Sequence, residues 1–583
     1  MRELRKKSSK QRREVSLLNN DDIKRDEIQR QQRKRIGAAV EDYMREDDDF
    51  EDVDTYIAPD PDEVFIKLCE DGSEEKPRLS EGDGHNPQEK PPAPSEEEIN
   101  KRRREIRKEL IKGKKIHRDI MISTYFFVAL FVGIIAYLCY FTYSKSDEFL
   151  ANEYNSKRQS VYADKYIRGD IKSIDGEILA TTKTDDDGKE TRVYPFKNVF
   201  AHAVGYSTKG NTGIESIGNS YLLGSHTALL SQALSELKNQ KIQGDTVVST
   251  IDSRLQKAAY EALDGKKGAV IAMEVKTGKV LLMVSRPDFD PNKINEIWDD
   301  MVSDESNSNL VNRATQGLYP PGSTFKILTL LEYIRENPDS YDSFSYDCDS
   351  IYENGEYSIR CSKQVSHGMQ DLKTAFANSC NGAFAVVGQS LKLDSLYDLC
   401  ESMGYNSAID TQLLVSKTKY SLTKDNASLW DVLQTSIGQG GTLTTPLLNL
   451  LIVSAAANDG VMQKPYIIDH IENANGSTVK TFSPENGRKV MYASEAKILG
   501  EYLRAVVTEG TGGNAEGKGY SVAGKTGSAE WSKGQDTHAW FVGYAPFDDP
   551  EIAVSVVVEN AGSGGGVAAP IARAVFDEYF GNN

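Results

Sequence analysis

A stretch of 25 uncharged residues, Ile120 to Ser144, limits what this chain can fold into more than any other feature. About twenty apolar residues are enough for a helix to cross the hydrocarbon core of a bilayer, so the stretch predicts a transmembrane helix over residues 120–144. The run before it, Lys101 to Arg118, holds ten Lys or Arg residues and two Glu residues. Because positively charged flanks remain in the cytoplasm, we expect a single-pass protein of the cell membrane, with its N-terminus cytoplasmic and everything after Lys145 outside.

The segment before the apolar stretch, residues 1–119, is charged and poor in aromatic residues. Such a composition cannot bury enough apolar surface to offset the entropy of ordering, so we predict a mostly disordered cytoplasmic tail; the basic run is either a solvated helix or a membrane-surface segment. A cleaved signal peptide is not predicted, because more than a hundred residues precede the apolar stretch. The formal net charge of −18 argues against nucleic-acid binding by the protein as a whole.

The six cysteines include no CxxC pair and no evident Cys/His cluster in the sequence, so neither a metal site nor another cofactor is predicted. Four of them lie beyond the apolar stretch: Cys348, Cys361, Cys380 and Cys400. Cys348 and Cys361 either pair around a small loop, if their side of the membrane is oxidising, or remain free thiols.

The remaining chain divides into two predicted domains. Residues 145–266 contain short strand-like pieces and turns, including a hairpin over Ile167–Thr182 and a helix over Ser253–Leu263. Residues 267–583 open with a strand hairpin over Gly268–Ser285 and are dominated by helical patterns from Ser323 to about Ala457. Further strands are predicted at Ser521–Ala529, Ala539–Tyr544 and Ile552–Val558, followed by a helix at Ala568–Phe580. Strands at both ends of a domain predict an antiparallel sheet flanked by helices, which is an α+β fold.

A serine and a lysine three residues apart stand at the start of one predicted helix. Ser323 follows the turn Pro320–Gly322, and Lys326 lies on the same helical face as Ser323. Unpaired first-turn NH groups and the positive end of the helix dipole favour developing negative charge there. The pattern is typical of a Ser-Lys nucleophile; the alternative is a capping serine and a surface lysine.

Two further motifs follow in the chain. Ser379-Cys380-Asn381 connects two helix-like segments, and Lys525-Thr526-Gly527 lies in a strand-like stretch. Each is weak alone, since Ser and Asn are common in turns and glycine in a strand has several uses.

Together, in the order SxxK, SxN and KTG, these motifs resemble those of the penicillin-recognising serine acyltransferases. From Lys145 to Phe580 the chain is similar to the class B penicillin-binding proteins, with Cys380 in place of the more usual Asp of the SxN motif. Flanking segments extend the resemblance: Arg168–Ile171, Asp175-Gly176, Gly213–Glu215, Asn312–Ala314, Gly438–Gly440, Thr445-Pro446 and Trp540–Tyr544. The resemblance implies a penicillin-binding transpeptidase fold over residues 267–583, preceded by a mostly β, non-catalytic pedestal over residues 145–266.

The resemblance also implies a peptidoglycan D,D-transpeptidase that cross-links stem peptides in cell-wall synthesis and is acylated by β-lactams. Lys326 accepts the proton of Ser323, which attacks the penultimate D-alanine of a D-Ala-D-Ala stem. Ser379 relays a proton to the leaving amine. Lys525 lies beside the site, where a second cation and desolvation both depress a lysine pKa.

Asn381, Thr526, Gly527 and Ser528 are expected to bind the substrate by the same resemblance, together with the catalytic residues Lys525 and Ser323. Asn381 bonds the donor peptide, Lys525 and Thr526 hold its terminal carboxylate, and Gly527 permits close approach to the backbone. The NH groups of Ser323 and Ser528 form the expected oxyanion hole. His367 and His538 are expected to have packed or exposed roles rather than to form a triad.

Other functions with the same acyl-enzyme chemistry remain as alternatives, namely a D,D-carboxypeptidase or β-lactamase and a non-catalytic β-lactam sensor. A bifunctional synthase is disfavoured, because residues 145–266 are too few for a glycosyltransferase domain. We therefore expect glycan polymerisation to come from a partner, a polytopic glycosyltransferase of the SEDS family.

Overall fold

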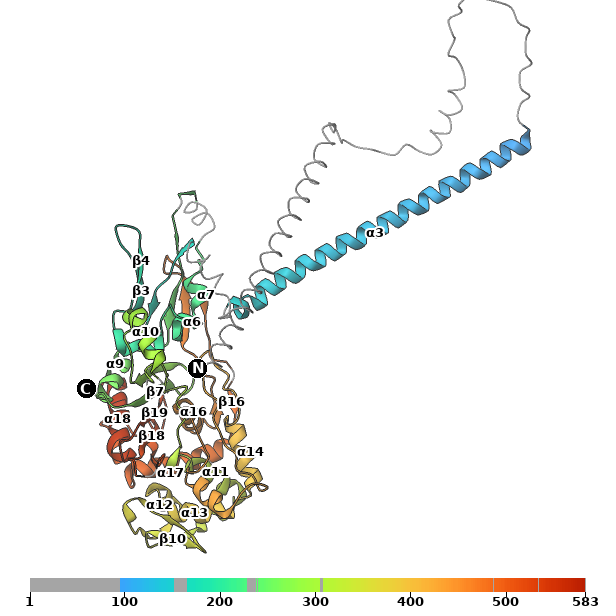
Figure 1. The fold of residues 1–583 in the computed structure, drawn as a ribbon. Helices are drawn as coiled ribbons and strands as arrows, with labels where there is room; N and C mark the ends of the chain where they lie inside the picture. Colours follow the sequence, from blue (N-terminus) through green and yellow to red (C-terminus); the bar gives the residue numbers. More distant parts are fainter. Residues whose placement is uncertain are drawn as a thin grey trace, which may run out of the picture. The chain divides into compact units, whose positions relative to one another are not determined.

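The computed structural model describes residues 95–150, 165–227, 237–238, 240–304, 308–485, 487–532 and 534–581. The disorder predicted for residues 1–94 lies outside this range. Helix α3 runs over Glu96–Leu150 and contains the basic run as well as the apolar stretch (Figure 1). It begins well before the predicted span, within the segment expected to be disordered, because Lys, Arg, Glu and Leu are all good helix formers.

One part of α3 is long and apolar enough to cross a membrane by length and composition. It covers Ile120–Leu138, 19 residues with a mean hydropathy of 2.2, and none of it is buried within the protein. The predicted span therefore coincides with an exposed apolar helix.

The catalytic part is built on a five-stranded antiparallel sheet in the order β17-β18-β19-β7-β8. β7 pairs with β19 along its whole length, so the first and last segments of the predicted domain meet. The α+β arrangement predicted for residues 267–583, an antiparallel sheet flanked by helices, is thereby confirmed. The strands are β7 (Gly268–Glu274), β8 (Val280–Arg286), β17 (Ala523–Ala529), β18 (His538–Ala545) and β19 (Ile552–Val558).

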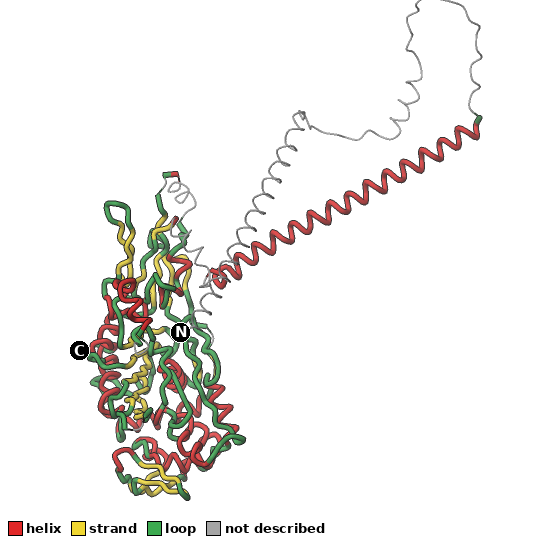
Figure 2. Tube along the Cα trace, in the orientation of Figure 1, coloured by secondary structure: helices red, strands yellow, loops and turns green. Residues whose placement is uncertain are grey.

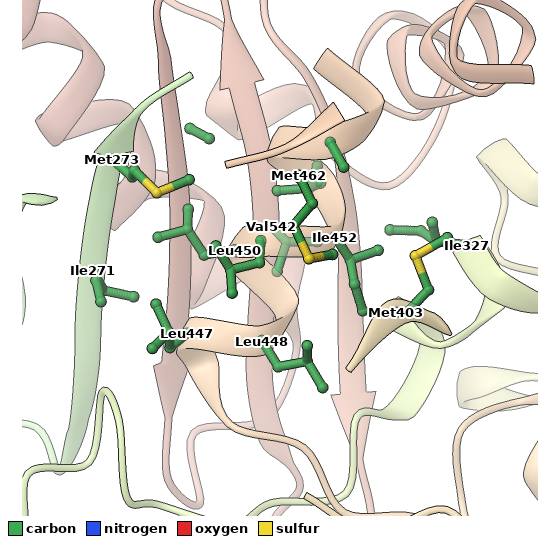
Figure 3. Packing of buried hydrophobic residues seen from close by; sticks show 14 of the residues in the cluster. Ile271, Met273, Ile327, Met403, Leu447, Leu448, Leu450, Ile452, Met462 and Val542 are labelled. Carbon is green, nitrogen blue, oxygen red and sulfur yellow. The ribbon is translucent and has the colours of Figure 1, made fainter. Parts of the chain in front are cut away.

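Both faces of this sheet are buried, which explains why β7, β8, β18 and β19 are mostly apolar rather than alternating; β17, which carries Lys525 and Thr526, is the exception. Successive side chains of β7 point to opposite faces: Ile271 and Met273 enter one core, and Val270 and Ala272 enter the other. Figure 3 shows the first core, where leucines of α16 (Pro446–Ala457) lie between β7 and Val542 of β18. Helices α9 (Ser253–Ala262) and α18 (Ala569–Tyr579) cover the other face.

The region predicted as helical after Ser323 also contains strands that the sequence analysis missed. Helices α11 (Lys326–Glu336), α12 (Leu372–Ala377), α13 (Asn381–Ser390) and α14 (Leu393–Met403) are present. Between α11 and α12 lie two short antiparallel pairs, β10 with β11 and β9 with β12. Figure 1 places β10 beside α12 and α13, and Figure 2 shows the strands there in yellow. The four strands are β9 (Ser345–Cys348), β10 (Ile351–Asn354), β11 (Tyr357–Arg360) and β12 (Gly368–Asp371).

The pedestal has its own six-stranded sheet in the order β15-β14-β6-β2-β3-β4. The predicted hairpin around Asp175-Gly176 is present as β2 and β3. Two strands, β14 and β15, come from within the range predicted for the catalytic domain, and β14 pairs with β6. The strands are β2 (Ile171–Lys172), β3 (Ile178–Thr184), β4 (Glu190–Val193), β6 (Thr246–Ser249), β14 (Ile468–Glu472) and β15 (Thr478–Thr481).

A buried carboxylate joins the separate segments of the pedestal. Glu215, whose side chain is fully buried, accepts from Arg168 Nε at 2.6 Å and from Arg192 Nε at 2.7 Å, and also from the Tyr194 hydroxyl at 3.0 Å. Two segments that carried the family resemblance thus meet in one ion cluster.

Replacing Glu215 by alanine is expected to destabilise the pedestal strongly. The change leaves two buried guanidinium groups without their counter-charge, a loss that costs about 3–5 kcal/mol of unfolding free energy. The loss of unfolding free energy is measured by urea unfolding of the full-length protein, with proteolytic cleavage within the pedestal as the readout. The control is Glu177→Ala at an exposed position. Its unfolding free energy should stay within about 0.5 kcal/mol of the wild-type value. Equal stabilities of the two variants would contradict the expectation.

Candidate active site

Ser323 lies in a tight turn that leads into a buried helix. Residues Gly322–Thr324 form one 3-10 turn, η3, and α11 continues from Lys326. Gly322 has φ 54, a conformation that favours glycine. The Trp540 indole donates to the Pro320 carbonyl at 3.1 Å, which ties the preceding proline turn to β18. The serine predicted at a helix N-terminus is therefore in a turn braced by the sheet.

Glycines let three segments close around this turn. A Cβ on Gly438 (φ 78) would lie 1.9 Å from the Gly322 carbonyl oxygen. In return, the Gly322 NH donates to the Gly438 carbonyl at 2.9 Å. A Cβ on Gly527 would lie 3.1 Å from the Trp540 Cβ and 3.2 Å from Thr324 Cγ2. Gly527 thus has a packing role that the sequence analysis did not anticipate.

Gly438→Ala is expected to displace the turn that holds Ser323. The new methyl group cannot coexist with the Gly322 carbonyl, and a shift of about 1 Å in a reacting group can cost about 10²-fold in rate. Stopped-flow acylation by a chromogenic β-lactam measures the effect. Gly441→Ala is the matched control, since its Cβ would meet only Ser421 Oγ at 3.8 Å; an unchanged rate in Gly438→Ala would contradict the expectation.

The Lys326 amine points at the SxN turn. It donates to the Ser379 carbonyl at 2.8 Å, to Asn381 Oδ1 at 2.7 Å and, more weakly, to Ser379 Oγ at 3.4 Å. Its side chain is fully buried. The structure therefore brings together the SxxK and SxN motifs, which lie more than fifty residues apart.

Lys525 reaches the same hydroxyl from β17. Its amine donates to Ser379 Oγ at 3.0 Å and to the Thr526 carbonyl at 3.0 Å, and this side chain too is fully buried. Ser379 thus lies between two amines that come from the two ends of the catalytic domain. It adopts φ 56, a strained conformation for serine that is often found at functional turns.

Burial lowers the pKa of both amines. The pKa of Lys326 falls to about 8, mainly because the charged form is desolvated. The pKa of Lys525 lies well below its usual value because of burial and, secondly, the neighbouring charge of Lys326. A neutral amine, able to accept a proton, is therefore accessible near neutral pH.

The structure shows two polar contacts at the KTG strand that the sequence analysis did not predict. Thr526 Oγ1 lies 2.5 Å from Thr511 Oγ1, and the Gly564 NH donates to Ser528 Oγ at 3.4 Å. Thr511 precedes two glycines, and Gly564 lies in the run Gly562–Gly566. Such glycine runs at the end of a helix and after a strand could have indicated backbone close to the site.

The two histidines considered in the sequence analysis, His367 and His538, make other contacts than with the predicted nucleophile Ser323. His538 accepts from the Asn560 NH at 3.2 Å and stacks on Trp531 with ring centroids 5.6 Å apart. His367 Nδ1 lies 3.4 Å from Cys348 Sγ. Among the described residues, neither histidine has a hydrogen bond to Ser323.

Residues 268–577, more than half of the chain, match the penicillin binding protein transpeptidase domain family. The chain belongs to the penicillin-binding proteins. Residues 168–247 also match the penicillin binding protein A dimerisation domain, which lies within the predicted pedestal. This pairing of domains is that of the class B penicillin-binding proteins.

Individual penicillin-binding proteins are similar over most of the region beyond α3. The peptidoglycan D,D-transpeptidase PbpA of Mycolicibacterium smegmatis is 33% identical over 458 residues, covering 72% of this chain and 90% of that protein. The D,D-transpeptidase domain of a peptidoglycan glycosyltransferase from Eggerthella lenta is 31% identical, with a TM-score of 0.65 over 71% of this chain and 98% of that one. Penicillin-binding protein A of M. tuberculosis, as its ceftriaxone acyl-enzyme complex, is 28% identical, with a TM-score of 0.65 over 72% of this chain and 99% of that one.

Proposed function

We propose that this class B penicillin-binding protein is a peptidoglycan D,D-transpeptidase that cross-links stem peptides through an acyl-enzyme on Ser323. One observation carries the proposal: the buried amines of Lys326 and Lys525 converge on the Ser379 hydroxyl, at 3.4 and 3.0 Å, beside the turn that holds Ser323. A general base, a proton relay and a nucleophile are then present in one site.

Acylation uses the lowered lysine pKa. Neutral Lys326 takes the proton of the Ser323 hydroxyl, and the oxygen attacks the carbonyl carbon of the penultimate D-alanine. The negative oxygen of the tetrahedral intermediate is stabilised by the NH groups of Ser323 and Ser528, as expected for the family. As the C–N bond breaks, Ser379 passes a proton to the departing amine of the terminal D-alanine, which leaves the donor stem as an ester of Ser323.

Transfer reverses the proton flow. An amine of a neighbouring stem peptide attacks the ester carbonyl and loses a proton towards Ser379 and Lys326. The C–O bond to Ser323 breaks, and the serine oxygen regains its proton. A new amide then joins the two stems, and the enzyme returns to its starting state.

The donor peptide is proposed to lie along the free edge of β17. β17 is the terminal strand of its sheet, and an extended peptide can pair with such an edge. Lys525 and Thr526 hold the terminal carboxylate there. The Asn381 amide already accepts from Lys326 and donates to the Arg360 carbonyl at 2.8 Å, so a donor peptide must replace Arg360 to receive that hydrogen bond. No cofactor takes part in these steps.

Hydrolysis and cross-linking are distinguished by the fate of the acyl group. Full-length protein in detergent is given a D-Ala-D-Ala stem peptide with and without an acceptor amine, and the products are separated by mass. Formation of the cross-linked product with acceptor supports the transpeptidase. Rapid hydrolysis of stem or penicillin, with no transfer, would instead establish a carboxypeptidase or β-lactamase, and acylation without any turnover would favour a sensor.

The acylation rate is expected to rise with pH to a plateau above about pH 8. Lys326 can accept a proton only when it is neutral, and its pKa is about 8. The neutral fraction therefore falls about tenfold for each pH unit below that value. Second-order acylation rates with a penicillin from about pH 6 to about pH 9 test this; a rate that fell on going from pH 6 to pH 8 would contradict it.

The membrane arrangement is proposed from the helix and its flanks. α3 anchors the protein, its basic end is cytoplasmic, and the catalytic domain lies outside the cell membrane. A polytopic SEDS-family glycosyltransferase then supplies the glycan and contacts the span and pedestal. Co-purification with that partner tests this arrangement, and partner binding that persists after both the apolar stretch and the pedestal are replaced would refute it.

A further inference from the structure

Three cysteines and one histidine gather beside the SxN motif. Cys348 Sγ lies 3.7 Å from Cys361 Sγ and 3.4 Å from His367 Nδ1, and Cys361 Sγ lies 3.8 Å from Cys380 Sγ. All four potential ligand atoms lie within 4.8 Å of one another. The three cysteines are buried, with exposures of 1%, 4% and 0%, and the histidine is half-buried. None of these side chains has a part in the transpeptidase steps.

The spacing fits a single four-coordinate metal ion. Zinc binds thiolate sulfur at about 2.3 Å and imidazole nitrogen at about 2.0–2.1 Å, in a tetrahedron. Two sulfurs on such an ion lie about 3.8 Å apart, and a sulfur and a nitrogen lie about 3.5 Å apart. The observed separations of 3.7, 3.8 and 3.4 Å match these edges.

The geometry points to a structural Zn²⁺ site formed by Cys348, Cys361, Cys380 and His367. Three thiolates with one imidazole are a set that zinc prefers for closed, structural sites. On binding, the three thiols lose their protons to solvent and the sulfurs donate to the metal, while the neutral imidazole binds through Nδ1. No change in oxidation state is involved.

The surrounding backbone already holds the ligands in place. The Ala383 NH donates to Cys380 Sγ at 3.5 Å, an outer contact that suits a thiolate. The Cys361 NH donates to the Ser350 carbonyl at 2.8 Å, and the His367 NH donates to the Cys348 carbonyl at 3.1 Å. The two strand pairs, β9 with β12 and β10 with β11, thus hold three of the four ligands without the metal.

The ion would connect the two strand pairs to the turn that holds the SxN motif. Cys348 ends β9, Cys361 follows β11, and His367 precedes β12. Cys380 is the N-cap of α13 and lies between Ser379 and Asn381. Those two neighbours are the acceptors of the Lys326 amine. A metal bound to Cys380 therefore fixes the turn that positions the lysine, and it does so whichever acyl acceptor the enzyme uses.

Metal content of the full-length protein tests the proposal. The protein is purified in detergent without chelator, and zinc is measured by inductively coupled plasma mass spectrometry. We expect about one zinc ion per chain, a loss to background in Cys348→Ala, and full retention in Cys400→Ala. Cys400 is a matched control, since it is a buried thiol of the same domain that is not part of the cluster. Zinc-free wild type, or equal zinc in Cys348→Ala, would overturn the proposal.

If Cys348→Ala does not fold, removal of the metal from the wild type by a chelator tests the zinc site instead. Removing the ion should lower the melting temperature and slow penicillin acylation, and Zn²⁺ but not Mg²⁺ should restore both. Substituted Co²⁺ should give the visible absorption of tetrahedral thiolate coordination, absent in Cys348→Ala or, if that variant is unfolded, in His367→Gln. A Cys348–Cys361 disulfide found by thiol titration and mass spectrometry would overturn the site, as would chelation without effect on either property.

Discussion

Ser323→Ala should abolish covalent labelling of the full-length protein by a fluorescent penicillin. The alanine has no oxygen to form the ester, and neither lysine amine is placed to replace it, since both donate to Ser379. Removing the nucleophile of a serine acyltransferase costs about 10⁶-fold in turnover, so no labelled band is expected. In-gel fluorescence after a fixed incubation measures it.

The control for this substitution is Ser343→Ala. Ser343 is exposed and lies in a short turn after α11, away from the three motifs. It should label as the wild type does, which shows that loss of a serine hydroxyl is not damaging in itself. Labelling of Ser323→Ala at the wild-type level would place the nucleophile elsewhere and remove the basis of the acyl-enzyme.

Lys326→Met should lower the acylation rate about 10²- to 10⁴-fold, the usual contribution of a general base. Methionine has a comparable length but cannot accept a proton, and it leaves Asn381 Oδ1 and the Ser379 carbonyl without their donor. The pH dependence described above should also disappear, because the group that titrates at about pH 8 is gone. A purely structural role of Lys326 would lower the rate without changing the shape of the pH profile.

The matched control for Lys326→Met is Lys373→Met on helix α12, where the lysine is exposed. Its rate and pH profile should equal those of the wild type. The melting temperatures of both variants are measured alongside, so that unfolding is not taken for loss of the base. A Lys326→Met variant that kept the wild-type rate would exclude this lysine as the proton acceptor.

Much of the catalytic sheet and its motifs could be predicted from the sequence, because local patterns specify them. The ends of β7, β8 and β19 coincide with apolar runs bounded by turns, and the helix predicted over Ser253–Leu263 is present as α9, with Asp252 as its N-cap. The order of the SxxK, SxN and KTG motifs along the chain indicated one site, and hydrogen bonds join one residue of each motif, namely Lys326, Ser379 and Lys525. The role of Ser323 as the nucleophile remains a prediction.

Features that depend on long-range pairing could not be predicted in the same way. Strands β9 to β12 are four residues each and carry polar residues such as Ser345 and Glu353, so no apolar alternation marks them. The cysteine and histidine cluster has twelve, five and twelve residues between its successive members. That spacing differs from the usual zinc motifs, and the four side chains come together only because the strand pairs β9–β12 and β10–β11 lie against the SxN turn.

The return of the chain to the pedestal has a mechanical consequence. β14 and β15 leave the catalytic fold, complete the sheet of β6, β2, β3 and β4, and lead back again. Lys172 of β2 also donates to Glu472 of β14 at 3.0 Å. The two parts are therefore joined by several backbone crossings and a shared sheet instead of one flexible linker. A rotation of the pedestal is therefore expected to move the catalytic sheet with it, because no single flexible linker between the two parts could take up the motion.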